Sequence, residues 1–311
     1  MNISAFRIGK SGLIKSRVGF GCWGLGGGSR ESPSYGKIKI SKALDLLDFS
    51  LTNEINFFDI SPAYGKAEEI LSLFLKKNKR ENIVISTKCG IEDFKKQSDY
   101  SEIYIRKQLK KSLKTVGTDY FDLVQLHNPP IECLNEIEKY NFFKKDLSTI
   151  VGSFGVSLKN PEDFFQISDF SLVDFIQVNF NLLDVRIIEK KIYEKCKKEN
   201  IKIIARTPFA FGFMTGKYVS NQKFSNTDHR KLWSVNEKVN WIKKSSEIFN
   251  FFRNQRKISQ AQLCLNFCLS FPGVSIVLPG IMNKSELIEN SNALSIGLLK
   301  TNEKKKIIDF N

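Results

Sequence analysis

The sequence predicts a (β/α)8 TIM barrel with a short N-terminal hairpin, formed by residues 1–311 as one α/β domain. Two observations carry this prediction. Short apolar runs that resemble β-strands alternate with helical segments along the chain, which is typical of a parallel sheet. Eight such runs can be counted, and a length of 311 residues suits a single large α/β barrel.

The N-terminal half of the chain provides the first four expected strands. Residues 3–20 predict the hairpin, which turns near residues 9–12 and leads into a first strand at Val18. Ser41 offers an N-cap to a helix in which leucines recur at helical spacing. Further strands are expected at 56–59, 83–88 and 121–127, and further helices at 67–75, 101–116 and about 134–145.

The C-terminal half supplies four more strands, expected at residues 150–156, 175–178, 201–205 and 274–278. A helix over residues 284–293 follows the last of them. Residues 209–240 contain no recognisable strand and are interpreted as a long βα loop with a short irregular helix. Loops of this length usually carry function, so we expect this segment to take part in it.

Composition and charge narrow the class of protein. No apolar run reaches the length of a membrane span, and charged residues interrupt the first 20 residues, so no secretory signal is expected. The six cysteines are scattered without a CxxC pair, which indicates reduced thiols in a cytoplasmic protein and no metal site. The net charge of +15 comes mostly from lysines spread along helices, so we expect no nucleic-acid or membrane partner.

In a parallel barrel all strand C-termini open on one face, and that face carries the chemistry. Polar residues of this chain lie at the C-terminal ends of the predicted strands. A phenol has a pKa of about 10, and a nearby lysine cation lowers this pKa by favouring the phenolate. We therefore expect Tyr64 to donate a proton. Asp59 would hold Lys88 charged and oriented, and His127 would direct a substrate oxygen toward the phenol. Each of these residues lies at, or just after, a strand end.

Two other features are interpreted as structural. Residues 19–24 match the GxGxxG pattern of dinucleotide-binding folds, but the glycine-rich segment that follows would not start the helix that such a site needs, so a Rossmann site is rejected. His229, the second of only two histidines, lies in the long loop and is interpreted as a loop residue rather than a catalyst.

With these residues in place, the chain resembles the aldo-keto reductase family. The resemblance extends from about residue 13 to about residue 295. The polar residues, in order and each at a strand end, make it specific. The matching segments, in family order, are FFDISPAYGKAEEIL, IVISTKCG, DYFDLVQLHNPP, GSFGVSL, DFIQVNFNLL, IIARTPFAFGFMTGKY and VSIVLPGIMNKSELIEN.

The resemblance implies NAD(P)H-dependent reduction of an aldehyde or ketone, such as a sugar or small carbonyl metabolite, to an alcohol, with Tyr64 as the proton donor. The alternative left open is a non-catalytic barrel that binds the cofactor and regulates a partner, as potassium-channel β subunits do. The expected partner is a small carbonyl substrate, and the oligomeric state stays open. Side chains expected near the substrate are Trp23 and Asn128, with Phe94, Trp233 and Trp241 in loops around them.

The resemblance also implies a cofactor site, with NADPH as the family default. Gly21 and Cys22 would line its mouth, and Ser157 and Gln177 would bind the nicotinamide carboxamide. Further cofactor residues would be Arg206, Thr207, Pro208, Phe209 and Gly212, with Thr215 and Lys217 in a covering loop, and Gly280, Met282, Glu286, Glu289 and Asn290 beyond the last strand.

Several positions depart from the family pattern. Leu158 stands where an asparagine normally follows the carboxamide-binding serine, so one amide contact is lost. Arg206 replaces an aromatic residue that stacks on the nicotinamide, although a guanidinium plane also stacks on rings. Met282 and Glu286 occupy positions where phosphate-selective relatives carry basic residues, and Lys284 is the only nearby cation in the sequence. Because a glutamate repels a 2′-phosphate and can bond a free ribose hydroxyl, NADH is kept as an alternative cofactor.

Overall fold

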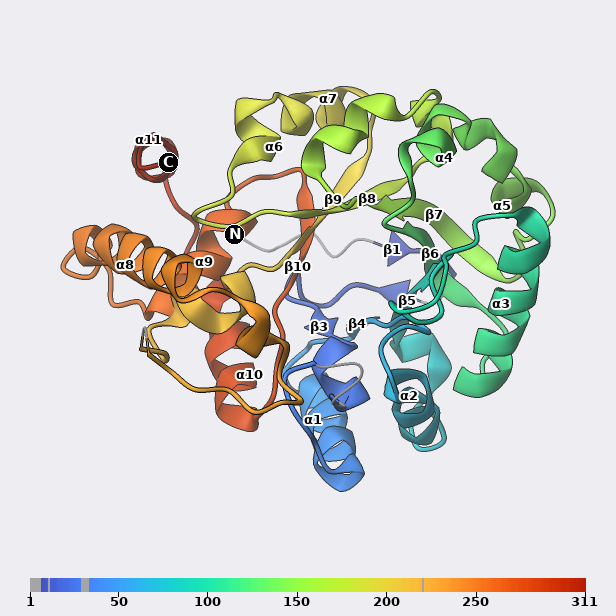
Figure 1. Cartoon of the computed structure of the whole chain (residues 1–311), viewed down its shortest axis with the longest axis horizontal. Helices are drawn as coiled ribbons and strands as arrows, with labels where there is room; N and C mark the ends of the chain where they lie inside the picture. Colours follow the sequence, from blue (N-terminus) through green and yellow to red (C-terminus); the bar gives the residue numbers. More distant parts are fainter. Residues whose placement is uncertain (1–6, 11, 29–33, 220) are drawn as a thin grey trace.

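The structure is a computed structural model that describes residues 7–10, 12–28, 34–219 and 221–311. Within this part of the chain, eight parallel strands form one sheet in which each strand pairs with the next, as predicted. Figure 1 shows these strands inside a ring of helices. They are β3 (Phe20–Gly21), β4 (Phe57–Asp59), β5 (Val84–Cys89), β6 (Phe121–His127), β7 (Val151–Ser157), β8 (Phe175–Asn179), β9 (Lys202–Arg206) and β10 (Val274–Leu278).

The sheet closes into a barrel between its first and last strands. Val18 pairs with Val277 and Gly21 pairs with Gly280, both in parallel, and the Gly19 amide donates to the Val277 carbonyl at 2.9 Å. The expected first strand at Val18 therefore lies at this seam, although β3 itself is only two residues long. The (β/α)8 barrel is thus confirmed.

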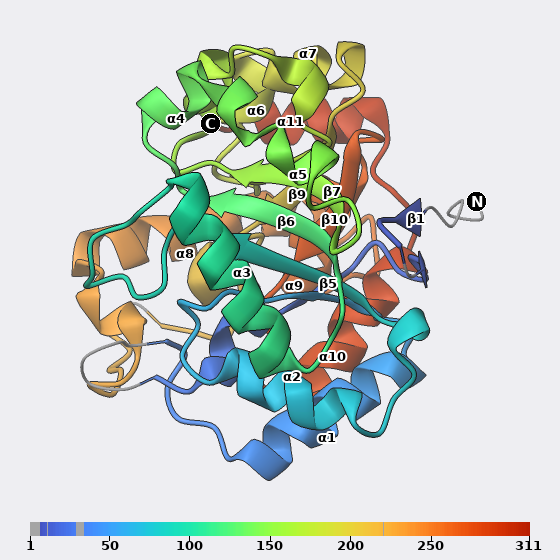
Figure 2. The same ribbon diagram turned by 90° about the vertical axis from the view of Figure 1, so that its right-hand side faces the viewer.

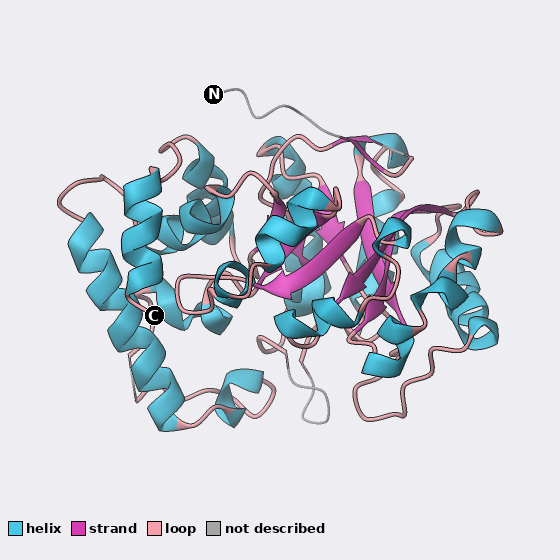
Figure 3. Ribbon diagram, turned by 90° about the horizontal axis from the view of Figure 1, so that it is seen from above, coloured by secondary structure: helices cyan, strands magenta, loops and turns pink. Residues whose placement is uncertain are grey.

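Helices cover the outside of the barrel, as Figures 2 and 3 show, and a hairpin closes its amino-terminal end. As predicted, the hairpin pairs β1 (Arg7–Ile8) with β2 (Gly12–Leu13). It lies so close to β7 that a Cβ on Gly152 would come within 2.4 Å of the Gly9 Cα atom. The longer helices are α1 (Ile40–Thr52), α2 (Ala67–Leu75), α3 (Glu102–Val116), α7 (Ile192–Lys198), α8 (Val235–Phe252), α9 (Gln260–Leu269), α10 (Lys284–Ser291) and α11 (Thr301–Asp309), and α6 (Arg186–Glu189) is a single turn.

The start of α1 differs from the prediction. α1 begins at Ile40 after Lys39, whose side chain makes no capping hydrogen bond, so the predicted cap at Ser41 is wrong and this serine lies in the first turn. The loop predicted over residues 209–240 is shorter than expected, because α8 begins at Val235. Before α8, its described residues form two short 3-10 helices, η6 (Ala210–Thr215) and η7 (His229–Leu232), where one irregular helix was expected.

The helix predicted at about 134–145 is also different, because it is split into shorter pieces. Its buried residues Leu134, Ile137 and Tyr140 recur every three positions, and 3-10 geometry places that spacing on one face. The backbone therefore tightens in the middle of the segment. The pieces are α4 (Ile131–Asn135), η3 (Ile137–Tyr140) and α5 (Phe142–Lys145).

Inward-facing side chains change from apolar to polar along the barrel axis. Side chains alternate between the two faces of a strand, so every second residue faces inward. On β5 the inward row is Val84, Ser86 and Lys88, all of them buried. The polar residues thus lie above an apolar layer, toward the carboxyl ends of the strands. That layer consists of Ile8, Ile14, Phe57, Val84, Leu123, Phe175, Ile204, Ile276 and Leu278.

Candidate active site

The predicted catalytic residues meet in the polar layer because their spacing from the apolar layer is even. Asp59 stands two residues beyond Phe57 on β4, and His127 stands four residues beyond Leu123 on β6. Tyr64 lies in the turn between β4 and α2, where its amide donates to the Ser61 carbonyl at 2.9 Å. The mouth of the barrel therefore gathers a carboxylate, a phenol, an ammonium and an imidazole.

A buried ion pair between Lys88 and Asp59 forms the floor of this site. The second carboxylate oxygen of Asp59 accepts hydrogen bonds from Ser86 Oγ and Gln177 Nε2, each at 3.1 Å. Gln125 in turn donates to Ser86 at 2.8 Å. Both oxygens of Asp59 are thus occupied, which fixes the direction of the Lys88 ammonium.

Tyr64 and Lys88 lie in contact, with Nζ 4.9 Å from the centre of the phenol ring. Burial raises the pKa of Tyr64, and the Lys88 charge lowers it by a smaller amount, so the net pKa is raised. The expected effect of the lysine is present, but the expected net lowering is wrong because burial outweighs it. Burial also lowers the pKa of Lys88, yet the charges of Asp59 and Tyr64 outweigh burial there and raise it. Lys88 is therefore an ammonium.

His127 stands edge-on to Tyr64, with ring centres 5.9 Å apart and an angle of 87° between the planes. Phe94 also packs edge-on against the imidazole, with ring centres 5.5 Å apart. Burial, followed by the charges of Lys88 and Arg206, holds the pKa of His127 well below its usual range. The imidazole is therefore neutral at physiological pH.

These residues open on a cavity of about 440 Å³. Phe94, Thr215 and Lys217, which the sequence placed in loops around the site, line it as well. Sequence-predicted residues that line the cavity are Gly21, Trp23, Asp59, Tyr64, His127, Asn128, Gln177, Arg206, Thr207, Pro208, Phe209, Gly212, Gly280, Met282, Glu286, Glu289 and Asn290.

Three predicted site residues, Cys22, Lys88 and Ser157, are buried behind the cavity wall rather than exposed in it. Ser157 contacts Gln177 at 3.5 Å and so supports a lining residue. Trp233 and Trp241 are also outside the lining and pack against Phe211, one of the residues that the sequence did not indicate. The lining residues not predicted are Tyr35, Phe211, Tyr218, Arg230, Ala261, Leu278 and Asn283.

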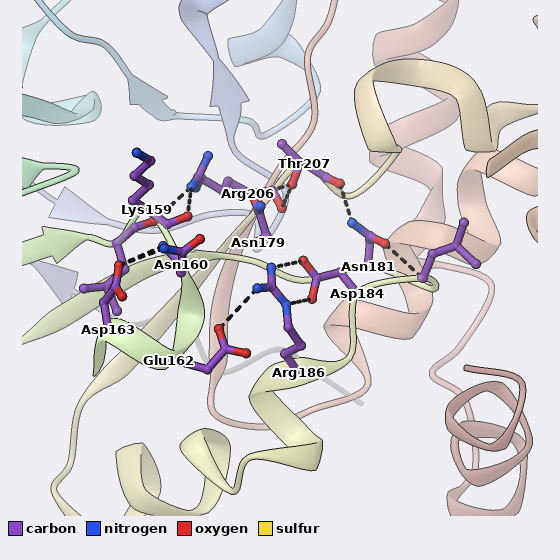
Figure 4. A network of polar contacts seen from close by, with 12 residues as sticks. Lys159, Asn160, Glu162, Asp163, Asn179, Asn181, Asp184, Arg186, Arg206 and Thr207 are labelled. Carbon is purple, nitrogen blue, oxygen red and sulfur yellow. Dashed lines mark hydrogen bonds and ion pairs between the residues drawn. The ribbon is translucent and has the colours of Figure 1, made fainter. Parts of the chain in front are cut away.

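Arg206 is held in place from behind, as Figure 4 shows. Its Nη2 atom donates to the Leu158 carbonyl at 2.9 Å, so Leu158, which departs from the family pattern, provides a backbone anchor. The next residue, Thr207, has a left-handed φ of 54°, which is strained for a β-branched residue. Its hydroxyl donates to Asn179 at 2.8 Å and its carbonyl accepts from Asn181 at 3.1 Å, and these bonds stabilise the turn.

Two carboxylates on α10, Glu286 and Glu289, lie near Lys217 from the long loop. Glu286 accepts the Met282 amide at 2.8 Å, and Lys217 Nζ lies 3.1 Å from Glu289 and 3.9 Å from Glu286. Lys217 therefore neutralises part of this region. The sequence leaves this role to Lys284 or to a lysine from another loop. Lys284 does not line the cavity and bonds Asp45 on α1, so the loop residue Lys217 fits the role.

The first βα loop and the long loop join above the cavity. The Ser34 amide donates to the Thr227 carbonyl at 3.1 Å, and the His229 amide donates to the Ser34 carbonyl at 2.8 Å. Arg230 adds a side-chain contact at this junction, with its guanidinium 5.1 Å from the Tyr35 ring centre. Within its own loop, Arg230 pairs with Asp228 at 2.6 Å and donates to the Tyr218 hydroxyl at 2.6 Å, so only the Tyr35 contact joins it to a distant part of the chain.

The described residues contain neither a metal-binding cluster nor a membrane-spanning helix. No group of three or more histidine, cysteine, aspartate or glutamate side chains is arranged to hold a metal ion among them. No helix in the same part of the chain is long and apolar enough to cross a membrane.

Comparison with known proteins identifies the family to which this chain belongs. Residues 17–311 match the model of the Aldo/keto reductase family, and the chain belongs to that family. The uncharacterized oxidoreductase YqkF of Bacillus subtilis (strain 168) is 29% identical over 97% of this chain and 94% of its own length. The NADH-specific methylglyoxal reductase of Escherichia coli (strain K12) is 25% identical over 94% of this chain and 93% of its own. The solved structure of the glycerol dehydrogenase AKR11B4 from Gluconobacter oxydans has the same fold, with a TM-score of 0.80 at 23% identity over 100% of this chain and 95% of that one.

Family membership confirms the predicted resemblance and class of enzyme. The chain is an oxidoreductase that uses a nicotinamide dinucleotide, NADPH or NADH, and carbonyl reduction is the chemistry of the family. The cavity fits such a group. Among the described residues, three lining side chains have a buried polar atom without a hydrogen-bond partner, namely Asn128 Oδ1, Arg206 Nε and Asn290 Nδ2. Buried polar atoms are normally paired, so the site is built for a polar ligand.

Proposed function

We propose that this chain reduces a small aldehyde or ketone to the alcohol, with Tyr64 as the proton donor and Trp23 and Asn128 beside the substrate. The observation that carries the proposal is the buried ion pair of Lys88 and Asp59. Asp59 lines the cavity, and Lys88 lies behind the cavity wall against the Tyr64 ring. A buried ion pair contributes little net stability because both charges lose their hydration. Its place beside the Tyr64 phenol therefore favours a chemical role.

A reduced dinucleotide held in this cavity would supply the hydride that the carbonyl carbon accepts. Tyr64 gives its phenolic proton to the carbonyl oxygen as the negative charge develops there. Lys88 stabilises the phenolate that remains, and Asp59 keeps Lys88 charged and oriented. General acid catalysis of this kind contributes roughly 10²–10⁴-fold to the rate.

His127 fits the role of a hydrogen-bond donor to the substrate oxygen rather than a second acid. Its lowered pKa keeps the ring neutral, so it does not compete with Tyr64 for proton transfer at neutral pH. Its perpendicular contact with the phenol places both groups at the same end of the cavity.

The remaining lining residues suit the two ends of one dinucleotide. Gln177, with Ser157 behind it, and the anchored guanidinium of Arg206 would hold the nicotinamide end of the dinucleotide. Glu286, Glu289 and Asn290 would hold the adenosine end, where a carboxylate suits a free ribose hydroxyl. We include NADH as well as NADPH on this ground.

Turnover tests the proposal against the regulatory alternative. The purified chain is mixed with NADPH or NADH and a panel of small aldehydes and ketones, and loss of the reduced cofactor is followed by absorbance. We expect turnover with at least one carbonyl compound, and its loss in Tyr64→Phe. A chain that binds the cofactor tightly but turns over no carbonyl compound would support the non-catalytic barrel instead.

A further inference from the structure

We propose that Ser61 is a positioning residue that fixes the tautomer of His127 and links it to Tyr64. Ser61 lies in the loop after β4 and is fully buried. Its hydroxyl oxygen is 3.3 Å from His127 Nδ1, and its carbonyl accepts the Tyr64 amide at 2.9 Å. One side chain and its own backbone thus contact both groups that act on the substrate oxygen in the proposed mechanism.

The direction of the Ser61–His127 hydrogen bond follows from counting protons. A hydroxyl has one proton to donate and two lone pairs that accept. The Ala63 amide donates to Ser61 Oγ at 3.2 Å, which uses one lone pair. Within the described part of the chain, His127 Nδ1 is the remaining atom in hydrogen-bonding contact with this oxygen. Because a buried donor without an acceptor is unfavourable, Ser61 donates and Nδ1 accepts.

The tautomer of His127 follows from the same bond. A neutral imidazole carries one proton, on either Nδ1 or Nε2. His127 is neutral because burial and the charges of Lys88 and Arg206 lower its pKa. With Nδ1 accepting from Ser61, the proton lies on Nε2 and is available for a hydrogen bond to a carbonyl oxygen. Only this last consequence, a benefit to carbonyl reduction, rests on the proposed function.

His229, the other of the two histidines in the sequence, serves as an internal control for this inference. His229 Nδ1 lies 2.9 Å from the Ser34 carbonyl oxygen, which can only accept. Burial lowers the pKa of His229, so this ring is neutral as well. Its proton must therefore lie on Nδ1, and the two histidines of one molecule are expected to show opposite tautomers.

Nitrogen NMR of the histidine-labelled protein, with its reduced cofactor bound, reads both tautomers directly. We expect the proton on Nε2 in His127 and on Nδ1 in His229, with His229→Gln assigning the signals. Ser61→Ala should convert His127 to a mixture of tautomers and leave His229 unchanged, whereas Ser61→Thr keeps the hydroxyl and should keep the wild-type pattern. A wild-type His127 protonated on Nδ1, or a Ser61→Ala variant with an unchanged pattern, would overturn the inference.

Kinetics then test the link to catalysis. Ser61→Ala should lower kcat roughly three- to tenfold, the effect of one hydrogen bond, with cofactor affinity unchanged and activity largely restored in Ser61→Thr. Ser50→Ala is the matched control, since it also removes a buried hydroxyl, one that donates to the Leu47 carbonyl at 2.7 Å in α1. A changed tautomer with unchanged kcat would refute the positioning role. Opposite tautomers in a chain that reduces no carbonyl compound would refute the proposed function and leave the Ser61–His127 bond standing.

Discussion

Burial and the neighbouring charge of Lys88 change the pKa of Tyr64 in opposite directions. Burial raises the pKa of the phenol and the ammonium lowers it, with burial the larger of the two. The phenol therefore holds its proton at neutral pH, as a donor must. Lys88 matters for the state that follows proton transfer, when the phenolate has to be stabilised in a buried site.

Tyr64→Phe should reduce kcat for carbonyl reduction by roughly 10²–10⁴-fold, because the ring stays and only the proton donor is removed. Cofactor affinity should change little. Single-turnover reduction and a cofactor titration, made on wild type and variant together, measure the two quantities. A variant that keeps near-wild-type rates in a chemistry-limited assay would show that the acid has been misassigned.

Lys88→Met should raise the pKa of the catalytic acid further, because the cation that lowers it is removed. The pH profile of the reverse reaction, alcohol oxidation, depends on the phenolate and should move to higher pH. Arg7→Met, on the amino-terminal hairpin, is a control for loss of a positive charge. An unshifted profile in Lys88→Met would remove this lysine from the mechanism.

Glu286→Arg should shift cofactor preference toward NADPH. In the wild type we expect weaker discrimination in favour of NADPH than a basic clamp would give, because Glu286 lines the cavity. Restoring a charge-assisted contact to the 2′-phosphate is worth roughly 1–3 kcal/mol. Lys217, which lies 3.9 Å from Glu286, would remain as a cation in both proteins.

Titration of both cofactors against wild type and variant measures this shift. Lys284→Met is the control, since Lys284 points away from the cavity to Asp45 and should leave the preference unchanged. Wild-type binding of NADPH about a thousandfold tighter than NADH would contradict the role given to Glu286.

Among individual residues, those at strand ends could be predicted from the sequence, but the contacts of loop residues could not. Asp59 and His127 could be predicted because strand alternation fixes which way they face. Lys217 and Lys284 could not be told apart, since only the path of the long loop decides which of them reaches Glu286. Ser61 carried no signal, because its role depends on a ring from another strand.

The contact between α2 and α3 contains a carboxyl group that links stability to pH. Glu68 on α2 is buried, and burial raises its pKa to about 7 from 4.5, with Ser112 on α3 and Lys111 opposing and Glu69 and Glu92 adding to the rise. The folded chain therefore holds this proton more tightly than the unfolded chain. Stability should fall as pH rises from about 4.5 to about 7, by at most about 3 kcal/mol from this group.

Glu68→Gln should remove this part of the pH dependence and make the chain more stable than wild type above pH 7. Chemical denaturation at about pH 5 and about pH 8 measures the difference in the free energy of unfolding. Glu247→Gln, which removes an exposed carboxyl group on α8, is the control. Equal pH dependence in the wild type and Glu68→Gln would show that this carboxyl group is not responsible.

Elements were predictable where one periodicity held throughout. The strands follow period two, and α3 follows the helical period with Ile105 and Leu109 on its buried face. The segment of α4, η3 and α5 changes period within a few residues, so a single helix was the wrong prediction there. The start of α1 was missed by two residues because Lys39, a poor capping residue, precedes the helix.

For the molecule as a whole, alternation of strands and helices was enough to predict a closed barrel, but not how its loops meet. The junction of Ser34 with Thr227 and His229 joins segments nearly two hundred residues apart. Such contacts depend on where the barrel places the two loops. The shape of the cavity mouth, with Tyr35 and Arg230, therefore became visible only in three dimensions.

The seam between β3 and β10 also sets when the site forms during synthesis. Asp59, Lys88 and His127 leave the ribosome long before Val277 pairs with Val18 and Gly280 pairs with Gly21. Until that last strand is inserted, a nascent chain holds every proposed catalytic group but lacks the wall that Gly280 and α10 give to the cavity. The ability to retain a dinucleotide is therefore among the last properties that a newly made molecule acquires.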